Sequence, residues 1–226
     1  MRTLRTGRPR VVAAFGLAAA VTVPSPAGAG GRTFDEDVAF LRKHVEVLVL
    51  QDAAGGRVAV VPAWQGRVMT SATGGSTARG FGWINDELVA SGQLRPHINA
   101  FGGEDRLWLG PEGGQFSIFF AKGDAFDLAH WQTPPLVDTE PWPVVSKEAD
   151  RATFRQRGRF VSYSGTPFDV ELERTVLLLS RDDVAKQLGG ALPAGVRLVA
   201  YASENTLVNA GPAPWTRETG ALSLWI

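Results

Sequence analysis

The chain has 226 residues, with 23 basic and 23 acidic side chains, seven tryptophans and no cysteine. The balanced charge argues against a nucleic-acid or anionic-membrane partner, which a basic excess would favour. The lack of cysteine excludes disulfides, thiolate metal sites and a lipid-anchored N-terminus. Tryptophan is costly to leave exposed, and its flat face suits stacking on ring-shaped ligands.

The first 29 residues have the three parts of a secretory signal. MRTLRTGRPR is basic, VVAAFGLAAAVTV is apolar, and Ala27-Gly28-Ala29 is a small-residue exit. The apolar run is shorter than the roughly 20 residues that cross a bilayer. A buried helix is the alternative, but helix-capping residues are missing. We therefore predict a signal peptide over residues 1–29 and a secreted or periplasmic domain over residues 30–226, without membrane contact after cleavage.

The rest of the chain has the pattern of short strands. Thr33 and Glu36 form a capping box that predicts a helix over residues 34–44. Ser180 caps a second short helix, and RATFRQRGRFVSY predicts two strands about Gly158. Other strands are predicted over residues 45–50, 57–62, 66–72, 115–121, 168–179, 196–203 and 220–226.

These elements predict an all-β antiparallel sandwich or barrel with two short helices. Residues 123–143 contain four prolines and two tryptophans, which predicts a long surface excursion. The sequence ends within an apolar strand, and such a strand is an aggregation hazard unless it is paired. We therefore expect the chain to be the N-terminal part of a longer β fold.

Three segments resemble galactose mutarotase-like proteins. RVAVVPAWQGRVMTSATGG is similar to their opening hairpin, and INAFGGEDRLWLGPEGGQ to their Gly-Gly stretch before a tryptophan-bearing strand. SENTLVNAGPAPWTRETGALSLWI resembles a later strand pair, and also an uncharacterised exported bacterial family, DUF6786. The resemblance implies a supersandwich with a carbohydrate site on a concave sheet face. The resemblance supports the fold and the ligand class better than it supports epimerase chemistry, because none of the three histidines stands in the Asn-His-aromatic pattern of the aldose epimerases.

The candidate site centres on residues 99–115. Sugar recognition needs planar hydrogen-bonding groups for hydroxyls and an apolar face for the ring, and this stretch supplies both. The predicted ligand-binding residues are Asn99, Gly102, Gly103, Asp105, Arg106, Trp108, Gln115, Trp131 and Asn205, and the resemblance adds Arg67. Each also has a structural reading, since glycines serve turns and tryptophans fill cores.

Three functions remain open. The first is the binding of a carbohydrate or small polyol. The second is an aldose epimerase or a glycoside-active enzyme, in which His97 or a Glu104/Glu112 carboxylate pair transfers protons. The third is a non-catalytic periplasmic interaction module anchored by Trp131 and Trp142. No cofactor is expected, and no metal, because no two histidines stand two to four residues apart and calcium-loop motifs are missing.

Overall fold

The computed structural model describes residues 10–21 and 31–225. These residues form three antiparallel sheets and three short α-helices, which confirms the prediction of a mostly β protein. The largest sheet has the strand order β1-β9-β8-β7-β6. Its strands are β1 (Arg10–Val21), β6 (Val144–Lys147), β7 (Arg151–Val161), β8 (Pro167–Leu178) and β9 (Leu198–Asn209).

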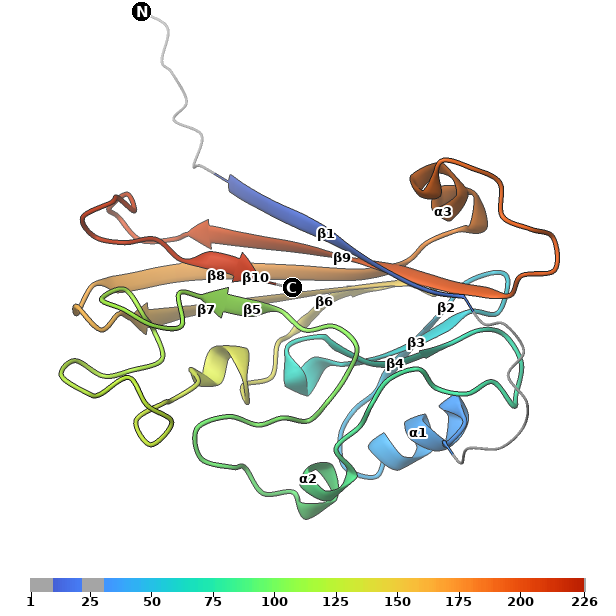
Figure 1. Ribbon diagram of the computed structural model, residues 1–226, viewed down its shortest axis with the longest axis horizontal. Helices are drawn as coiled ribbons and strands as arrows, with labels where there is room; N and C mark the ends of the chain where they lie inside the picture. The colour runs from blue at the N-terminus through green and yellow to red at the C-terminus, as the bar shows by residue number, and fades with distance from the viewer. Residues whose placement is uncertain (1–9, 22–30, 226) are drawn as a thin grey trace, which may run out of the picture.

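Two small sheets face the inner side of the large sheet (Figure 1). One follows the order β2-β3-β4 and the other pairs β10 with β5. Their strands are β2 (Leu48–Gln51), β3 (Arg57–Val61), β4 (Arg67–Ala72), β5 (Trp108–Gly110) and β10 (Ser223–Trp225). The β2–β3 hairpin and the third strand are therefore confirmed.

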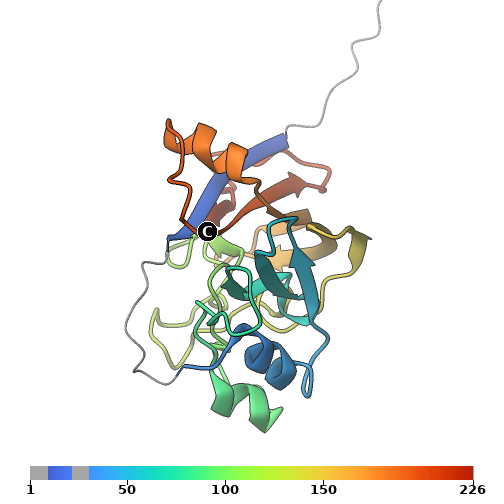
Figure 2. The ribbon, with the colours of Figure 1, turned by 90° about the vertical axis from the view of Figure 1, so that its right-hand side faces the viewer.

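Alternation along β3 separates two hydrophobic cores. Val58 and Val60 face the large sheet and join the core between the sheets. Ala59 and Val61 point the other way, into a second core beneath α1 (Phe34–Leu41) and α2 (Asp86–Ser91). The molecule thus has three layers, with the β2–β4 sheet in the middle and these helices on its outer side (Figures 1 and 2).

The outer face of the large sheet is polar, as the alternation of β8 predicts. Phe168, Val170 and Leu172 are buried, and the acidic residues between them face outward. These acids pair across to arginines of β7, for example Arg157 Nε to Glu171 Oε2 at 2.6 Å. Such exposed ion pairs contribute little to stability, so this face is chiefly a solvated surface.

The helices differ from the prediction in number. The capping box of α1 is present, and α3 (Arg181–Leu188) begins after its Ser180 cap. The described residues hold a third helix, α2, which was missed. Asn85 accepts from the Leu88 amide at 3.1 Å and Gly92 ends the helix at φ +61°. Six residues are too few to show a helical period, so only these end signals mark α2.

Two strand predictions were wrong. Residues 115–121 form turns, because Ser117 Oγ donates to Glu112 O at 2.7 Å and accepts from the Phe119 amide. Phe119 and Phe120 follow this turn, and both are buried. Residues 151–161 form one continuous strand, β7, without a turn at Gly158. A Cβ there would lie 2.7 Å from the Leu136 side chain, so this glycine makes room for packing.

The predicted signal segment is only partly described. Its residues 1–9 and 22–29 lie outside the described residues, and residues 10–21 form β1, which pairs antiparallel with β9. The signal peptide therefore stays a prediction. No helix among the described residues is long and apolar enough to cross a membrane.

The predicted excursion over residues 123–143 returns to the core before it ends. Its final part holds a 3-10 turn, Pro135–Val137, in which Leu136 and Val137 are buried. Trp142 is only 1% exposed, and its Nε1 donates to Leu136 O at 2.8 Å. Trp142 is therefore a core residue and is not available as the surface anchor that the interaction-module hypothesis requires.

Candidate functional site

A polar seam interrupts the core where β4 and residues 102–106 lie over the large sheet. Most inward-facing side chains of β8 and β9 are apolar, but four in this region are polar and three of these hydrogen-bond across the layers. The polar seam consists of Ser71, Glu104, Asp105, Arg174, Tyr201, Ser203 and Asn205. Burying so many polar groups is tolerated only when they are hydrogen-bonded to one another.

Arg174 is fully buried and links the large sheet to the layer above it. Its Nε donates to Gly66 O at 3.1 Å, its Nη1 donates to Asn205 Oδ1 at 2.9 Å, and its Nη2 pairs with the Asp105 carboxylate. The second oxygen of Asp105 accepts from Ser203 Oγ at 3.0 Å. The predicted ligand-binding residues Asp105 and Asn205 are therefore engaged in contacts that hold the layers together.

Glu104 is held in the same seam. Its carboxylate accepts from the Ser71 amide at 2.6 Å, from Ser71 Oγ at 2.8 Å and from the Tyr201 hydroxyl at 3.3 Å. Burial raises the pKa of the Glu104 carboxyl above its ordinary value, although the bonds from Ser71 oppose that shift. Burial and the charge of Glu104 also raise the pKa of Tyr201. Glu104 thus ties β4 to β9.

Replacing Glu104 tests this role. Glu104→Ala leaves the Ser71 amide and the Ser71 and Tyr201 hydroxyls without this acceptor, and should lower the free energy of unfolding by roughly 1–3 kcal/mol for each that stays unsatisfied. Glu104→Gln keeps the shape. Because the folded-state pKa of Glu104 is raised above 4.5, its carboxyl stabilises the fold below that pH and loses this contribution as pH rises.

The stability of Glu104→Gln relative to the wild type should therefore increase as the pH rises from below 4.5 to neutral. Urea unfolding of the three proteins across this pH range measures both effects. A pH-independent difference between Glu104→Gln and the wild type would contradict the raised pKa. An unchanged stability of Glu104→Ala would show that the carboxylate does not join the strands.

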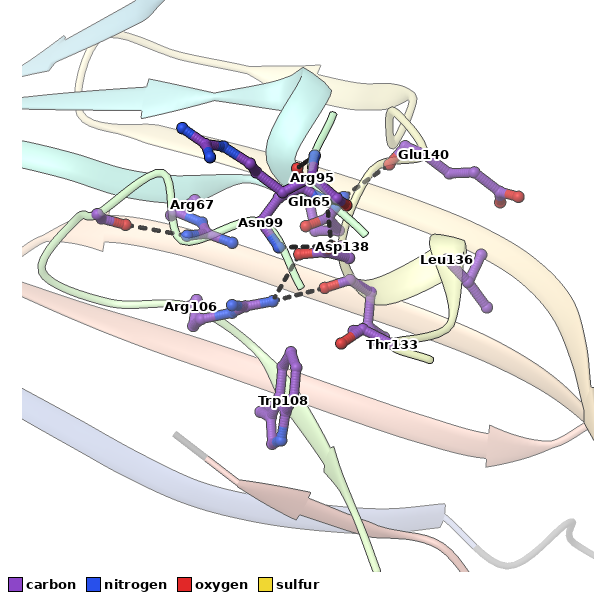
Figure 3. A network of polar contacts seen from close by, with 12 residues as sticks. Gln65, Arg67, Arg95, Asn99, Arg106, Trp108, Thr133, Leu136, Asp138 and Glu140 are labelled. Carbon is purple, nitrogen blue, oxygen red and sulfur yellow. Dashed lines mark hydrogen bonds and ion pairs between the residues drawn. The ribbon is translucent and has the colours of Figure 1, made fainter. Parts of the chain in front are cut away.

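Next to the polar seam, four polar side chains point toward one another from separate elements (Figure 3). We call Arg67, Asn99, Arg106 and Asp138 the Arg67 cluster. Asp138 Oδ2 accepts from the backbone amide of Asn99 at 3.0 Å and from Asn99 Nδ2 at 2.8 Å. Arg106 Nη2 donates to Val137 O at 2.8 Å and lies 3.7 Å from Asp138 Oδ1. Arg67 Nη1 donates to Gly102 O at 2.9 Å.

The Arg67 cluster holds four buried atoms without a hydrogen-bond partner in the described residues. They are Arg67 Nε, Arg67 Nη2, Arg106 Nε and Asp138 Oδ1. Native proteins satisfy about 90% or more of their buried polar groups, usually with protein atoms, water or an ion, so these four atoms mark the place where a water molecule, an ion or a ligand would complete the hydrogen bonding. The set contains three donors and one acceptor, and it carries one net positive charge if all three side chains are ionised.

Burial shifts the ionisation of both arginines. It lowers the pKa of Arg67 to about 9, with repulsion from Arg106 adding to the effect. It also lowers the pKa of Arg106 to about 10, although the nearby Asp138 carboxylate opposes this change. Both values are well above 7, so both guanidinium groups stay charged at neutral pH and keep their donors available to a ligand.

Gly102 and Gly103 allow the chain to pass close to Arg67. Both have positive φ, and a Cβ on Gly103 would lie 2.7 Å from Val68 O, while one on Gly102 would lie 2.3 Å from Trp83 O. The two predicted glycines thus shape the wall of the Arg67 cluster, and Gly102 also supplies the carbonyl that binds Arg67.

An aromatic surface adjoins the Arg67 cluster. The Arg106 guanidinium lies 4.1 Å from the ring centroid of Trp108, and Trp108 Nε1 donates to Glu112 Oε1 at 2.7 Å. The rings of Trp108 and Trp131 both pack against Phe119, at 5.3 and 4.5 Å between centroids. Because Trp108 is only half-buried, it can present part of its ring beside the cluster.

His97 lies at the edge of this surface in a strained conformation. Its φ is +71°, a value that non-glycine residues rarely adopt. Its Nδ1 lies 2.6 Å from the carbonyl oxygen of Trp131. Since a carbonyl only accepts, Nδ1 carries the proton and neutral His97 keeps its lone pair on Nε2.

The structure therefore gathers part of the predicted site. Arg67, Asn99 and Arg106 meet in one cluster, and Trp108 and Trp131 share a neighbouring ring. Glu104 and Glu112 have separate hydrogen-bond partners, on β4 and β9 for Glu104 and on Trp108 for Glu112. Gln115 is exposed.

Sequence reasoning missed Arg174 and Asp138. Arg174 occupies an inward position in the alternation of β8, and this charged residue on an apolar face was a readable signal. Asp138 follows a short 3-10 turn and had no local signal. In the part of the chain that the structure describes, no three acidic or histidine side chains are grouped to hold a metal ion.

Comparison with known proteins identifies a family. Residues 32–226 match the model of a family of unknown function, DUF6786. No curated protein and no solved structure shows significant similarity to the chain. The match covers most of the sequence, including every strand except β1 and the whole Arg67 cluster. The chain therefore belongs to the DUF6786 family.

Proposed function

We propose that this protein is an exported carbohydrate-binding protein of the galactose mutarotase-like supersandwich fold, with its ligand at the Arg67 cluster. The observation that carries the proposal is the set of four buried, unpartnered polar atoms on Arg67, Arg106 and Asp138. The resemblance of the Gly-Gly stretch to mutarotase-like proteins supports the same ligand class. The N-terminal signal pattern supports export to the periplasm or the exterior.

The mixture of donors and an acceptor favours hydroxyl groups as the ligand. A hydroxyl both donates and accepts, so one sugar can bind the arginine N–H groups and also donate to Asp138 Oδ1. A phosphate or carboxylate would face that same carboxylate oxygen and be repelled. Arg106, whose side chain is 26% exposed, is the most exposed member of the cluster, so we expect a ligand to approach along Arg106 and Trp108.

Titration followed by tryptophan fluorescence tests the proposal. We expect saturable quenching or enhancement by at least one of D-galactose, D-glucose, D-mannose or myo-inositol, because a ligand bound beside Trp108 changes the surroundings of its ring. Inorganic phosphate at matched ionic strength is the control and should give no saturable change. A folded protein that responds to none of these compounds would contradict the proposal, and a response to phosphate alone would redirect it to anions.

A second candidate function is proton transfer to a bound sugar, and the geometry of His97 favours it. With Nδ1 donating to Trp131 O, Nε2 keeps its lone pair and can accept a proton as a general base. Polarimetry of the interconversion of α- and β-D-galactose measures this activity. If His97 is the base, His97→Ala should reduce the rate to the uncatalysed value, whereas the exposed His130, paired with Asp127, serves as the control in His130→Ala. Equal rates in wild type and His97→Ala would remove His97 from the reaction.

A further inference from the structure

An apolar hollow of about 360 Å³ opens where the turn over residues 118–122 faces the end of β7. Its lining includes Phe119, Phe120, Lys122, Gln132, Val161 and Ser162. The volume is within the range of small-molecule sites, roughly 300–1,000 Å³. The lining combines apolar side chains with three polar groups, the Lys122 ammonium, the Gln132 amide and the Ser162 hydroxyl. The hollow therefore suits a ligand that has both an apolar face and hydrogen-bonding groups.

A continuous row of aromatic rings joins this hollow to the Arg67 cluster. It starts at Trp108, whose ring face contacts the Arg106 guanidinium, and continues to Phe119. Trp131 packs against Phe119 and also against Phe120, at 5.5 Å between centroids. Because Phe119 and Phe120 also line the hollow, one packed aromatic cluster lies beneath both places.

Phe126 extends the row into solvent. Its ring packs edge-on against Phe120 at 4.9 Å and tilted against Tyr163 at 4.8 Å, yet 52% of the residue is exposed. A half-exposed aromatic ring that two neighbours hold in place offers a flat apolar face on which a sugar ring can stack. Since the ring is already held in place, little conformational freedom is lost when a ligand stacks on it.

We propose that this hollow binds an outer unit of an extended oligosaccharide whose inner unit occupies the Arg67 cluster, an inference that rests on the proposed function. The apolar faces of successive sugar rings lie on the exposed parts of Trp108, Trp131 and Phe126, which the buried Phe119 and Phe120 support from below. The Gln132 amide and the Lys122 ammonium bind hydroxyls at the hollow, and both would be left against apolar atoms by a hydrophobic peptide. The natural ligand is therefore a chain of sugar units rather than a monosaccharide.

Calorimetric titration of the whole chain with sugars of increasing length tests this proposal. The probes are D-glucose, cellobiose and cellotetraose, and D-galactose with its β-1,4-linked dimer and tetramer. In the series that binds, we expect the tetramer to bind at least about tenfold more tightly than the monomer. Phe126→Ala should remove that gain and leave the affinity for the monomer unchanged. Leu128→Ala, which removes an exposed apolar side chain without a ring, should keep the gain.

The outcomes separate this proposal from the proposed function. Equal affinity for monomer and tetramer would overturn the outer subsite and leave monosaccharide binding at the Arg67 cluster intact. Binding of no sugar by the folded protein would overturn both. If Phe126→Ala lowers the melting temperature, Gln132→Ala replaces it, since Gln132 is exposed at the hollow. A full affinity gain retained in Gln132→Ala would then overturn the outer subsite.

Discussion

Asp105→Ala is expected to lower the free energy of unfolding by about 3–5 kcal/mol, the effect of removing one partner from a buried ion pair. Arg174 is completely buried, and Asp105 is the acid that neutralises it. Ser203 Oγ also loses its acceptor in this variant. For a chain of this size, the melting temperature should fall by roughly 6–20 °C, which thermal unfolding followed by circular dichroism measures.

Glu171→Ala is the matched control for this prediction. It removes the acid of the exposed Arg157–Glu171 pair on the outer face of the same sheet, where water solvates the remaining charge. Its melting temperature should stay within error of the wild type. If Asp105→Ala is no less stable than Glu171→Ala, the Asp105–Arg174 pair does not hold the two layers together.

Arg67→Met is expected to reduce sugar affinity about 100-fold. The ligand-free variant should be more stable than the wild type, or less stable by no more than about 1 kcal/mol. Arg67 is 98% buried, and two of its nitrogens have no hydrogen-bond partner in the described residues. Its buried charge therefore lowers the free energy of unfolding of the ligand-free protein. Methionine fills a similar volume without a charge. The lost bond to Gly102 O offsets part of the stabilisation.

Urea unfolding and calorimetric titration of the same samples measure the two halves of this prediction. Arg155→Met is the control, because Arg155 is exposed on the outer face and paired with Glu173, and it should change neither quantity. A large loss of stability in Arg67→Met would show that its guanidinium is structural. Unchanged affinity in a stable Arg67→Met would place the ligand elsewhere.

Much of the fold was readable because local patterns and tertiary packing agree. The QDAAGG turn between two apolar runs gives the β2–β3 hairpin, and strict alternation gives β8. The capping box of α1 likewise lies where Thr33 and Glu36 predict it. In these segments the side chains that define the pattern are the ones that enter the two cores.

Other segments depend on contacts distant in sequence. Residues 115–121 have the composition of a strand, but the hydrogen bonds of Ser117 turn the chain. The site shows the same limit. Arg106 lies two residues before Trp108, but its partner Asp138 comes from another segment, and only packing brings the unpartnered atoms together. A sequence displays donors and acceptors without showing which of them the fold will leave unused.

Nuclear magnetic resonance of the arginine side chains tests the proposed sugar site most directly, because Arg67 Nε and Arg106 Nε are both unpartnered donors. Arg67→Met and Arg106→Lys assign their Nε–Hε signals by deletion. On addition of the tightest-binding sugar, both signals should shift in a saturable way, with one dissociation constant, while that of Arg174, whose Nε donates to Gly66 O, stays in place. Saturable sugar binding that leaves the Arg67 and Arg106 signals unmoved would contradict a ligand site at the Arg67 cluster.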